Sequence, residues 1–475
     1  MSELNNNNMP CEEKIAEFTG EKKASGFSGK LGFVLAAAGS AVGLGNLWRF
    51  PYLTARYGGG IFILCYIILA VFFGVTLLML EIGIGRHTGK SVIGAFAKLN
   101  KKFKWFGYAC VIVPIIIVPY YCVIGGWVVK YGWSYITGNQ GLVGSSANTG
   151  AYFEGFISST YEPLIFFLVF AVLTVVVVAF GVQKGIEKMS KILMPTLAAI
   201  SVFLMIYVIC QPGALAGVGY ALIPDFSKFG FETVLGALGQ LFYSMSIGMC
   251  IMVTYGSYMK KSVSIKSSST QIAICDSAFA LVASLIIIPA VYAFGNPEIA
   301  FAPDGDGPAL MFIQLANVFN KLPGGSIIAV VFFVLVLFAA VTSSVSLVES
   351  IVAVLCEDGR MKRVTACLIV FSAILVLGAL SSLGFGALSD VSIMWKGKAM
   401  SILDMFDFLA NNILMPIVAI ITCVIAGWFI NKHILPKEIG LDKNKHLNRY
   451  FNVIIKFVAP ICIVAILISG LFLNI

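Results

Sequence analysis

The sequence predicts an all-α polytopic membrane protein with a single transmembrane domain. Of its 475 residues, 59% are hydrophobic and only 12% are charged, whereas soluble domains carry about 25% charged residues. Apolar runs of about 20 residues, the length that a helix needs to cross a bilayer, recur along the chain. No polar stretch after residue 30 is long enough to separate two domains, so we expect a tail over 1-30 and one transmembrane domain over 31-475.

The apolar runs predict eleven transmembrane helices. Residues 1-30 have no apolar core, so we do not expect a cleavable signal peptide. The expected spans lie near 31-55, 61-83, 106-134, 163-181, 192-211, 233-258, 271-295, 325-356, 364-383, 399-430 and 451-474.

Lysine and arginine predict the orientation in the membrane. With the N-terminus inside, 24 of the 32 Lys and Arg residues lie in cytoplasmic segments and seven lie toward the outside. Basic residues favour the cytoplasmic side of a membrane. We therefore expect a multi-pass protein of the cytoplasmic (plasma) membrane with a cytoplasmic N-terminus and, because the number of spans is odd, an external C-terminus.

The composition argues against several other classes of protein. The net charge of +9 comes from basic clusters between apolar runs, so it indicates membrane orientation and not nucleic-acid binding. The eleven Cys form no C-x-x-C pair and the three His lie in basic loops without an H-E-x-x-H motif, which excludes recognisable zinc and metalloprotease sites. We expect neither an enzyme nor an organic cofactor.

The first and sixth spans are interrupted by glycines and polar residues. Residues 36-52 contain three glycines, Asn46, Arg49 and Pro51, and residues 239-249 combine Gln240 and two serines with Gly248. Close packing through small residues explains glycines but not Asn46 or Arg49. Broken helices at membrane depth line cavities, and breaks five spans apart predict an inverted repeat of five plus five helices with a central site. The repeats are expected over about 31-211 and 233-430, followed by an extra helix over 451-474.

The eighth span carries a cluster of hydroxyl groups at residues 342-346. Hydroxyl and carbonyl oxygens suit a small hard cation such as sodium. The alternative is that each hydroxyl bonds a carbonyl of its own helix.

Acidic residues within the spans are few, and each is costly unless it is paired, hydrated or bound to an ion. Asp276 is the deepest candidate for a cation ligand. Asp407 and Arg49 lie at outer helix ends and are expected to pair. We interpret Glu81 and Glu349 as structural.

The segment from Gly39 to Pro51 closely resembles the neurotransmitter:sodium symporter family, specifically its bacterial amino-acid transporters. Eleven spans match a common bacterial variant of a family in which many members have twelve. The resemblance extends over nearly all spans, through Gly58 to Gly60, Tyr120 and Tyr121 with Trp127, Gly185 to Lys188, Pro224 to Lys228, residues 239-249, Thr342 to Ser344 and Asp404 to Phe408.

The resemblance implies two sodium sites as its only cofactors. In relatives, one sodium ligand of the seventh span is Asn, which aligns here with Cys275 or Asp276, and we favour Asp276. Chloride-dependent relatives bind the anion near Tyr66, Gln240 and Ser244, so a fixed carboxylate at Asp276 predicts chloride independence. The first site would comprise Ala41, Asn46, Ser244 and Asp276, together with the substrate carboxylate, and the second Gly39, Val42, Ala339, Thr342 and Ser343.

The same resemblance implies a pocket for a neutral amino acid. No acidic residue occupies the stretch of the first span where amine transporters use one, and Tyr121 would bind the substrate carboxylate. Apolar residues with an adaptable Met suit a large aliphatic or aromatic side chain. The implied pocket residues are Ser40, Ala41, Leu44, Gly45, Ile117, Tyr121, Tyr243, Ser244, Ser246, Met249, Ser343 and Leu347.

Gates are implied on both sides of the pocket. Outside, Arg49 with Asp407 and the rings of Tyr121 and Tyr243 would close over the substrate. Inside, Glu357 or Asp358 would face Ala24 and Lys23 of the tail, near Tyr258, with Phe27 replacing the usual Trp.

These expectations predict a sodium-coupled importer of a neutral amino acid that works by alternating access in the lipid bilayer. The alternative is a substrate sensor or an ion-conducting channel built on the same fold. A hydrophobic pocket distinguishes one methylene by only about 1–3 kcal/mol, so the sequence leaves the individual amino acid open, as it does the oligomeric state.

Overall fold

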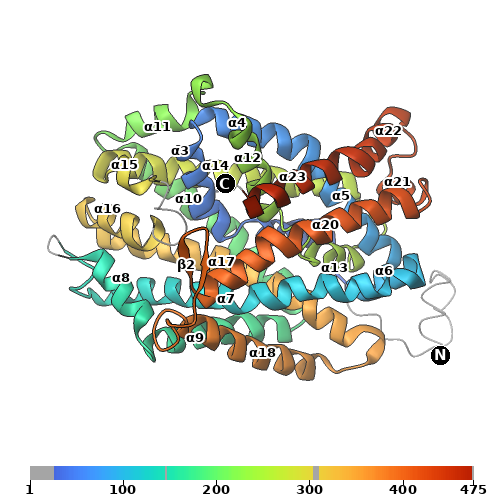
Figure 1. The fold of residues 1–475 in the computed structure, drawn as a ribbon, viewed down its shortest axis with the longest axis horizontal. Helices are drawn as coiled ribbons and strands as arrows, with labels where there is room; N and C mark the ends of the chain where they lie inside the picture. The colour runs from blue at the N-terminus through green and yellow to red at the C-terminus, as the bar shows by residue number, and fades with distance from the viewer. Residues whose placement is uncertain (1–25, 145–146, 303–309, 473–475) are drawn as a thin grey trace, which may run out of the picture.

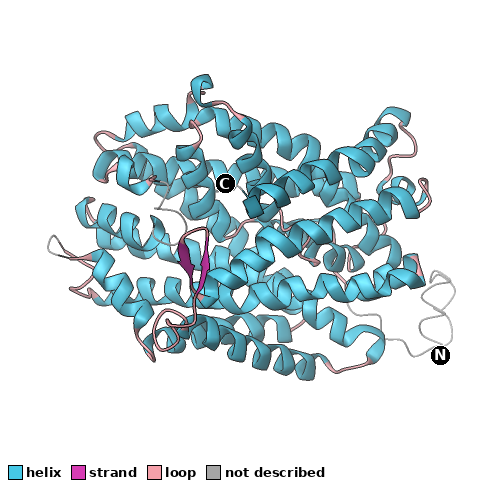
Figure 2. Cartoon of the chain, in the orientation of Figure 1, coloured by secondary structure: helices cyan, strands magenta, loops and turns pink. Residues whose placement is uncertain are grey.

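A computed structural model describes residues 26–144, 147–302 and 310–472. Most helices run roughly along the long axis of the molecule (Figure 1). Figure 2 shows that helices form nearly all of this structure, with one small β-hairpin. The hairpin pairs β1 (Ile393–Trp395) with β2 (Lys398–Met400) in antiparallel register.

Within the described residues, nine continuous helices are long and apolar enough to cross a membrane, and a bent pair adds a tenth. The remaining predicted span, the sixth, is divided into α12 and α13. The predicted all-α polytopic fold is therefore confirmed. The spans are α2 (Lys30–Ala41) with η1 (Gly45–Arg49) and α3 (Phe50–Arg56); α4 (Gly60–Leu69) with η2 (Ala70–Gly74) and α5 (Val75–Thr88); α7 (Lys104–Thr137); α9 (Glu162–Ala179); η4 (Val182–Glu187) with α10 (Lys188–Ile209); α12 (Phe231–Ser244) with α13 (Ile251–Ser257); α14 (Ile265–Phe294); α17 (Gly325–Cys356); α18 (Arg363–Leu383); α19 (Ile402–Asp407) with η8 (Phe408–Leu414), α20 (Met415–Val424) and η9 (Ile425–Phe429); and α22 (Lys445–Val453) with η10 (Ile454–Val458) and α23 (Ala459–Phe472).

The two ends of the bundle differ in their connections. We call the end that carries α6, α21 and the start of α22 the basic end, and the end that carries α8, α15, α16 and the β-hairpin the hairpin end (Figure 1). The expected long loops at the hairpin end contain short helices. The connecting helices are α6 (Val92–Leu99), η3 (Lys101–Phe103), α8 (Thr149–Ser158), α11 (Ala214–Leu222), η5 (Phe226–Lys228), α15 (Pro297–Ala300), η6 (Leu310–Gln314), α16 (Leu315–Lys321), η7 (Glu357–Gly359) and α21 (Ile434–Ile439).

Both predicted helix breaks are present. The segments on either side of the break after Ala41 are bent by 56°. The second break, between Ser244 and Ile251, uses left-handed backbone at Ser246 (φ 55°), Gly248 (φ 78°) and Cys250 (φ 67°). Left-handed conformations at residues other than glycine are strained, and such strain concentrates at functional sites.

Burial separates central from peripheral helices. The most apolar window of the α7 span is 78% buried, whereas that of the α22–α23 span is 22% buried. Exposed apolar side chains on the peripheral helices, including Ile206 and Ile461, suit a surrounding bilayer. The two broken helices therefore pack against central helices such as α7 and α17.

Helix α13 lies directly on α5 through two glycines. A Cβ on Gly85 would lie 1.9 Å from the carbonyl oxygen of Val253, and one on Gly256 would lie 2.5 Å from that of Ile82. Contacts below about 3 Å are not tolerated, so only glycine permits this approach. The second half of the broken sixth span, α13, is thereby fixed to α5.

Candidate substrate and sodium site

A cavity lies between the two helix breaks and the central helices α7 and α17. It contains about 30 Å³ of open space, and a buried water needs roughly 10–15 Å³. The cavity therefore has room for only about two or three waters, and the lining side chains must move apart to admit a larger molecule. All twelve residues predicted to form the substrate pocket line this cavity, and Gly43, Asn46 and Ile251 complete it. The resemblance did not point to Gly43 or Ile251. The binding role of the twelve predicted residues stays a prediction.

Serines connect the two breaks. The Ser246 hydroxyl donates to the carbonyl of Ser40 at 3.2 Å, and the two hydroxyl oxygens lie 3.5 Å apart. At the edge of the first break, the amide of Leu44 lies 3.5 Å from the hydroxyl of Tyr121. Polar groups of three spans therefore converge on one cavity.

Asp276 is fully buried beside this cavity. Its Oδ1 accepts hydrogen bonds from Asn46 Nδ2 at 2.8 Å and Ser244 Oγ at 2.6 Å, and its Oδ2 accepts one from Tyr66 Oη at 2.6 Å. Three donors satisfy a carboxylate that would otherwise be costly at membrane depth. The structure thus brings together Asp276, Asn46 and Ser244. Cys275, the residue before Asp276 in the sequence, is only half-buried.

Carbonyl and hydroxyl oxygens converge between α2 and α17. The Ser343 hydroxyl lies 3.1–3.4 Å from the carbonyl oxygens of Gly39, Ser40 and Val42. Thr342 Oγ1 donates to the carbonyl of Ala339 at 3.0 Å. Ser343 therefore bridges to α2, while Thr342 follows the alternative that the sequence left open, a bond within its own helix.

These oxygens form an arrangement suited to a hard monovalent cation. Across the described ranges, no group of three or more His, Cys, Asp or Glu side chains could hold a metal ion. The clustered oxygens are instead backbone carbonyls, hydroxyls and the single carboxylate of Asp276. Such hard oxygen donors, without nitrogen or sulfur ligands, favour sodium over transition metals.

Glu81, which lies on α5, forms a hydrogen bond to the backbone of the second break. Its Oε1 accepts a hydrogen bond from the amide of Gly248 at 2.8 Å. The side chain is buried, and its Oε2 has no hydrogen-bond partner among the described residues. The structural role expected for Glu81 thus consists in fixing a backbone amide that the broken helix leaves unpaired.

Of the residues predicted to form the outer gate, Tyr121 and Tyr243 line the cavity, and Asp407 ends helix α19, which directly follows the β-hairpin. The guanidinium of Arg49 lies 5.6 Å from the centroid of the Tyr243 ring. Asp407 accepts a hydrogen bond from Asn411 at 2.6 Å. In the part of the chain that the structure describes, no ion pair joins Arg49 to Asp407.

Comparison with known proteins decides the family. The model of the sodium:neurotransmitter symporter family matches residues 24–148 and 157–474. The chain belongs to this family. The predicted resemblance is confirmed, and the protein is a membrane transporter rather than an enzyme.

Individual members of the family align over nearly their whole length. An uncharacterized sodium-dependent transporter of Bacillus subtilis, YhdH, is 36% identical over 94% of this chain and 98% of its own. An uncharacterized sodium-dependent transporter of Haemophilus influenzae is 33% identical over 96% of this chain and 100% of its own. The crystal structure of MhsT in complex with L-phenylalanine superposes with a TM-score of 0.83 at 35% identity, covering 94% of this chain and 99% of that one.

At the basic end of this symporter, the acid beside Tyr258 is Glu349. Tyr258 Oη donates to Glu349 Oε1 at 2.8 Å, and the fully buried Glu349 also pairs with Arg363. The predicted gate acid, Glu357, accepts a hydrogen bond from Ser91 instead. The predicted tail residues Ala24 and Lys23 lie outside the described residues. Sequence reasoning missed Arg363, a cation that follows a transmembrane acid by fourteen residues across a turn.

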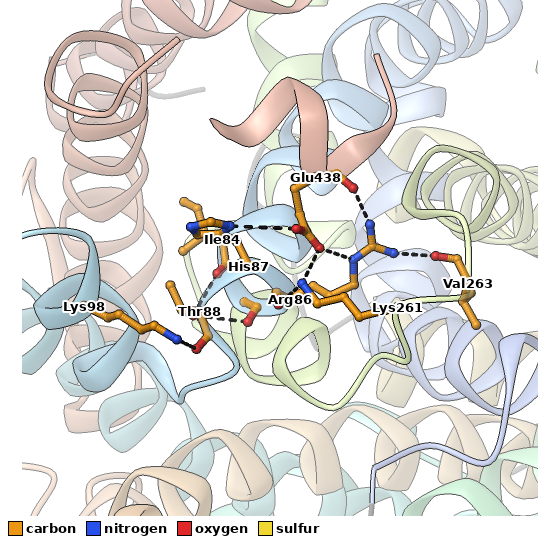
Figure 3. Close-up of polar contacts among 9 residues, drawn as sticks. Ile84, Arg86, His87, Thr88, Lys98, Lys261, Val263 and Glu438 are labelled. Atoms are coloured by element: carbon orange, nitrogen blue, oxygen red, sulfur yellow. Dashed lines mark hydrogen bonds and ion pairs between the residues drawn. The ribbon is translucent and has the colours of Figure 1, made fainter. Parts of the chain in front are cut away.

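A second polar cluster at the basic end holds three segments together (Figure 3). Arg86 Nε pairs with Glu438 Oε1 at 2.7 Å, and its other nitrogens donate to the carbonyls of Glu438 and Val263. Lys261 Nζ lies 2.9 Å from the same Glu438 oxygen, and His87 Nδ1 lies 3.8 Å from the other. The cluster thereby joins the end of α5, the loop after α13 and the short helix α21.

Glu438 is the centre of this cluster and lies outside the spans. Burial raises the pKa of its carboxyl, but hydrogen bonds and charges from Lys261 and Arg86 outweigh this effect, so that its pKa is lowered overall. The carboxylate is consequently ionised at neutral pH and pairs with Arg86 and Lys261.

Proposed function

We propose that this protein is a symporter that couples the import of a large neutral amino acid to sodium and does not need chloride. The observation that carries the proposal is the fixed carboxylate of Asp276, which accepts hydrogen bonds from Asn46, Ser244 and Tyr66 beside the cavity. A carboxylate at this position supplies the negative charge that supports sodium binding without a halide.

The lining of the cavity supports an amino acid as substrate. Ends of broken helices present unpaired amide and carbonyl groups, which suit a carboxylate and an ammonium group respectively. The remaining lining includes Ile117, Met249 and Leu347, which favour an apolar side chain. MhsT, similar over nearly its whole chain, was crystallised with L-phenylalanine, which supports the same class of substrate.

Two sodium ions are proposed. The first would bind Ala41, Asn46, Ser244 and Asp276 together with the substrate carboxylate, so that each ligand raises the affinity for the other. The second would bind the oxygens around Ser343 and Thr342. We further propose that the basic end faces the cytoplasm, that the two repeats alternate access around the central cavity, and that the protein resides in the plasma membrane.

Transport into proteoliposomes tests the proposal. Labelled leucine, phenylalanine, tryptophan and tyrosine are each offered with an inward sodium gradient, with potassium replacing sodium, and with gluconate replacing chloride. Uptake that requires sodium but not chloride supports the proposal. Sodium-dependent binding in detergent without accumulation in vesicles would instead indicate a sensor, and sodium current without accumulation would indicate a channel.

The variant Asp276→Asn tests the role of the carboxylate. We expect its uptake to fall at least about tenfold in gluconate, because the neutral amide removes the charge that balances sodium, and to recover partly in chloride. The variant Asp225→Asn is the matched control, since Asp225 caps the short helix η5 and does not line the cavity. Equal uptake by Asp276→Asn and the unmodified protein in gluconate would refute the chloride argument.

A further inference from the structure

Asn411 lies in α-helical register with Asp407, one turn further along the same span, within the π-helical segment η8. Its Nδ2 donates to Asp407 Oδ1 at 2.6 Å and to the hydroxyl of Tyr120, on α7, at 3.2 Å. A carboxylate can only accept hydrogen bonds, so the amide nitrogen must face it. The orientation of the Asn411 side chain therefore follows from chemistry.

The amide of Asn411 is only partly satisfied. Its Oδ1 is buried and has no hydrogen-bond partner among the described residues. A buried acceptor without a partner costs free energy, so stability alone does not account for an asparagine here. π-helical turns inside transmembrane helices frequently mark functional positions, and this turn sets the amide between Asp407 and the central helix α7.

Asp407 has no ion pair with Arg49 in this structure, and Arg49 lies over the ring of Tyr243 instead. Asp407 Oδ1 accepts a hydrogen bond from Asn411, and the Tyr120 hydroxyl also hydrogen-bonds to the Asp407 side chain. With two partners on neighbouring elements, the carboxylate cannot rotate freely. An arginine binds a carboxylate best when the carboxylate is already fixed in one orientation.

We propose that Asn411 is a positioning residue of the gate at the hairpin end. It holds the Asp407 carboxylate against Tyr120 so that Arg49 finds it in one orientation when the gate closes over the substrate. This inference deepens the proposed function and rests on it, because it assumes that substrate is occluded behind this gate.

The test is a double-mutant cycle in the transport assay. Alone, Asn411→Ala should raise KM for the transported amino acid roughly tenfold, the effect of losing a hydrogen bond to a charged group, and should speed release of bound substrate from the hairpin side. Maximal uptake and thermal stability in detergent should change little. In the background of Asp407→Asn, the same substitution should have almost no further effect, because Asn411 acts through Asp407.

Asn412→Ala is the matched control, because the neighbouring Asn412 lies against Gly470 of α23 and should leave KM unchanged. Tyr120→Phe should show a smaller rise in KM, since the bond from the amide to Asp407 remains. Additive effects of Asn411→Ala and Asp407→Asn, or an unchanged KM in Asn411→Ala, would overturn the inference while leaving sodium-coupled uptake by the unmodified protein intact. Failure of that uptake would instead refute the proposed function.

Discussion

The two ends of the bundle hold their charged residues in different ways. At the basic end, Arg86, Lys261 and His87 surround Glu438, and Arg363 pairs with the buried Glu349. At the hairpin end, Arg49 and Asp407 form no ion pair with each other: Arg49 lies over the ring of Tyr243, and Asp407 accepts a hydrogen bond from the neutral amide of Asn411. The basic end is thus held together by ion pairs that are already formed. At the hairpin end, the two charged gate residues are not paired with each other.

Because of this difference, we expect substitutions at the two ends to have different effects on stability and on transport. Substitutions in the paired clusters of the basic end should lower stability and bias the transporter toward opening there. Substitutions of the unpaired gate should alter retention of the substrate with little loss of stability.

The largest effect is expected at Arg363. Replacing it with Met leaves the carboxylate of Glu349 buried without its cation, which typically costs on the order of 3–5 kcal/mol. Thermal unfolding in detergent should show a markedly lower midpoint. Adding Glu349→Gln should restore much of the stability, and a double variant as unstable as Arg363→Met alone would contradict this account.

The next effect is expected at Asp407. The variant Asp407→Asn removes the charge that Arg49 would meet on closure, so KM should rise about tenfold or more while the unfolding midpoint stays within a few degrees of the original. Substrate kinetics and thermal unfolding on the same preparation check both parts. A large loss of stability would mean that the hairpin end, like the basic end, depends on a contact already formed.

A smaller effect is expected at Glu438. Neutralising it by Glu438→Gln removes the shared partner of Arg86 and Lys261, so the basic end should open more often. Labelling of an introduced cysteine at the basic end should become severalfold faster. Asp442→Asn, an exposed acid nearby in the same connection, is the control and should label at the original rate.

The smallest effect is the pH dependence of the same cluster. Because the pKa of Glu438 is lowered in the folded protein, its ionised form stabilises the fold at neutral pH, and this contribution is lost as pH falls below the usual carboxyl range through the lowered value. Unfolding midpoints between about pH 7 and pH 3 should fall less steeply for Glu438→Gln than for the unmodified protein. Parallel curves would exclude this role of Glu438.

Sequence patterns predicted the parts of the structure that depend on local composition. Glycines and Asn46 located the first break, and hydrophobic length located the spans, because both signals arise within one segment. The twelve substrate-pocket residues carried over from the resemblance also met around one cavity. The short helices α8 and α21 and the β-hairpin were not predicted, since their brief polar segments carry no strong periodic signal.

Pairing between distant segments was harder to predict. Nothing near Glu438 in the sequence indicates that Arg86, more than 350 residues earlier, is its partner. Glu349 was interpreted as structural without its cation, and Tyr258 was expected beside Glu357. Such pairs follow from how helix ends meet in three dimensions, and a single sequence does not record that arrangement.

The glycine contact between α5 and α13 has a mechanical consequence. Gly85 and Gly256 let the backbones of α5 and α13 lie in direct contact, so we expect the two helices to move together. Glu81 on α5 also accepts a hydrogen bond from Gly248 in the strained second break. The hydrogen bond from Ser246 to Ser40 connects this break to the first one. Displacing α13 and α5 at the basic end would therefore also move the backbone of the second break. Because this backbone lines the cavity, a small movement among the surface charges would change the shape of the cavity.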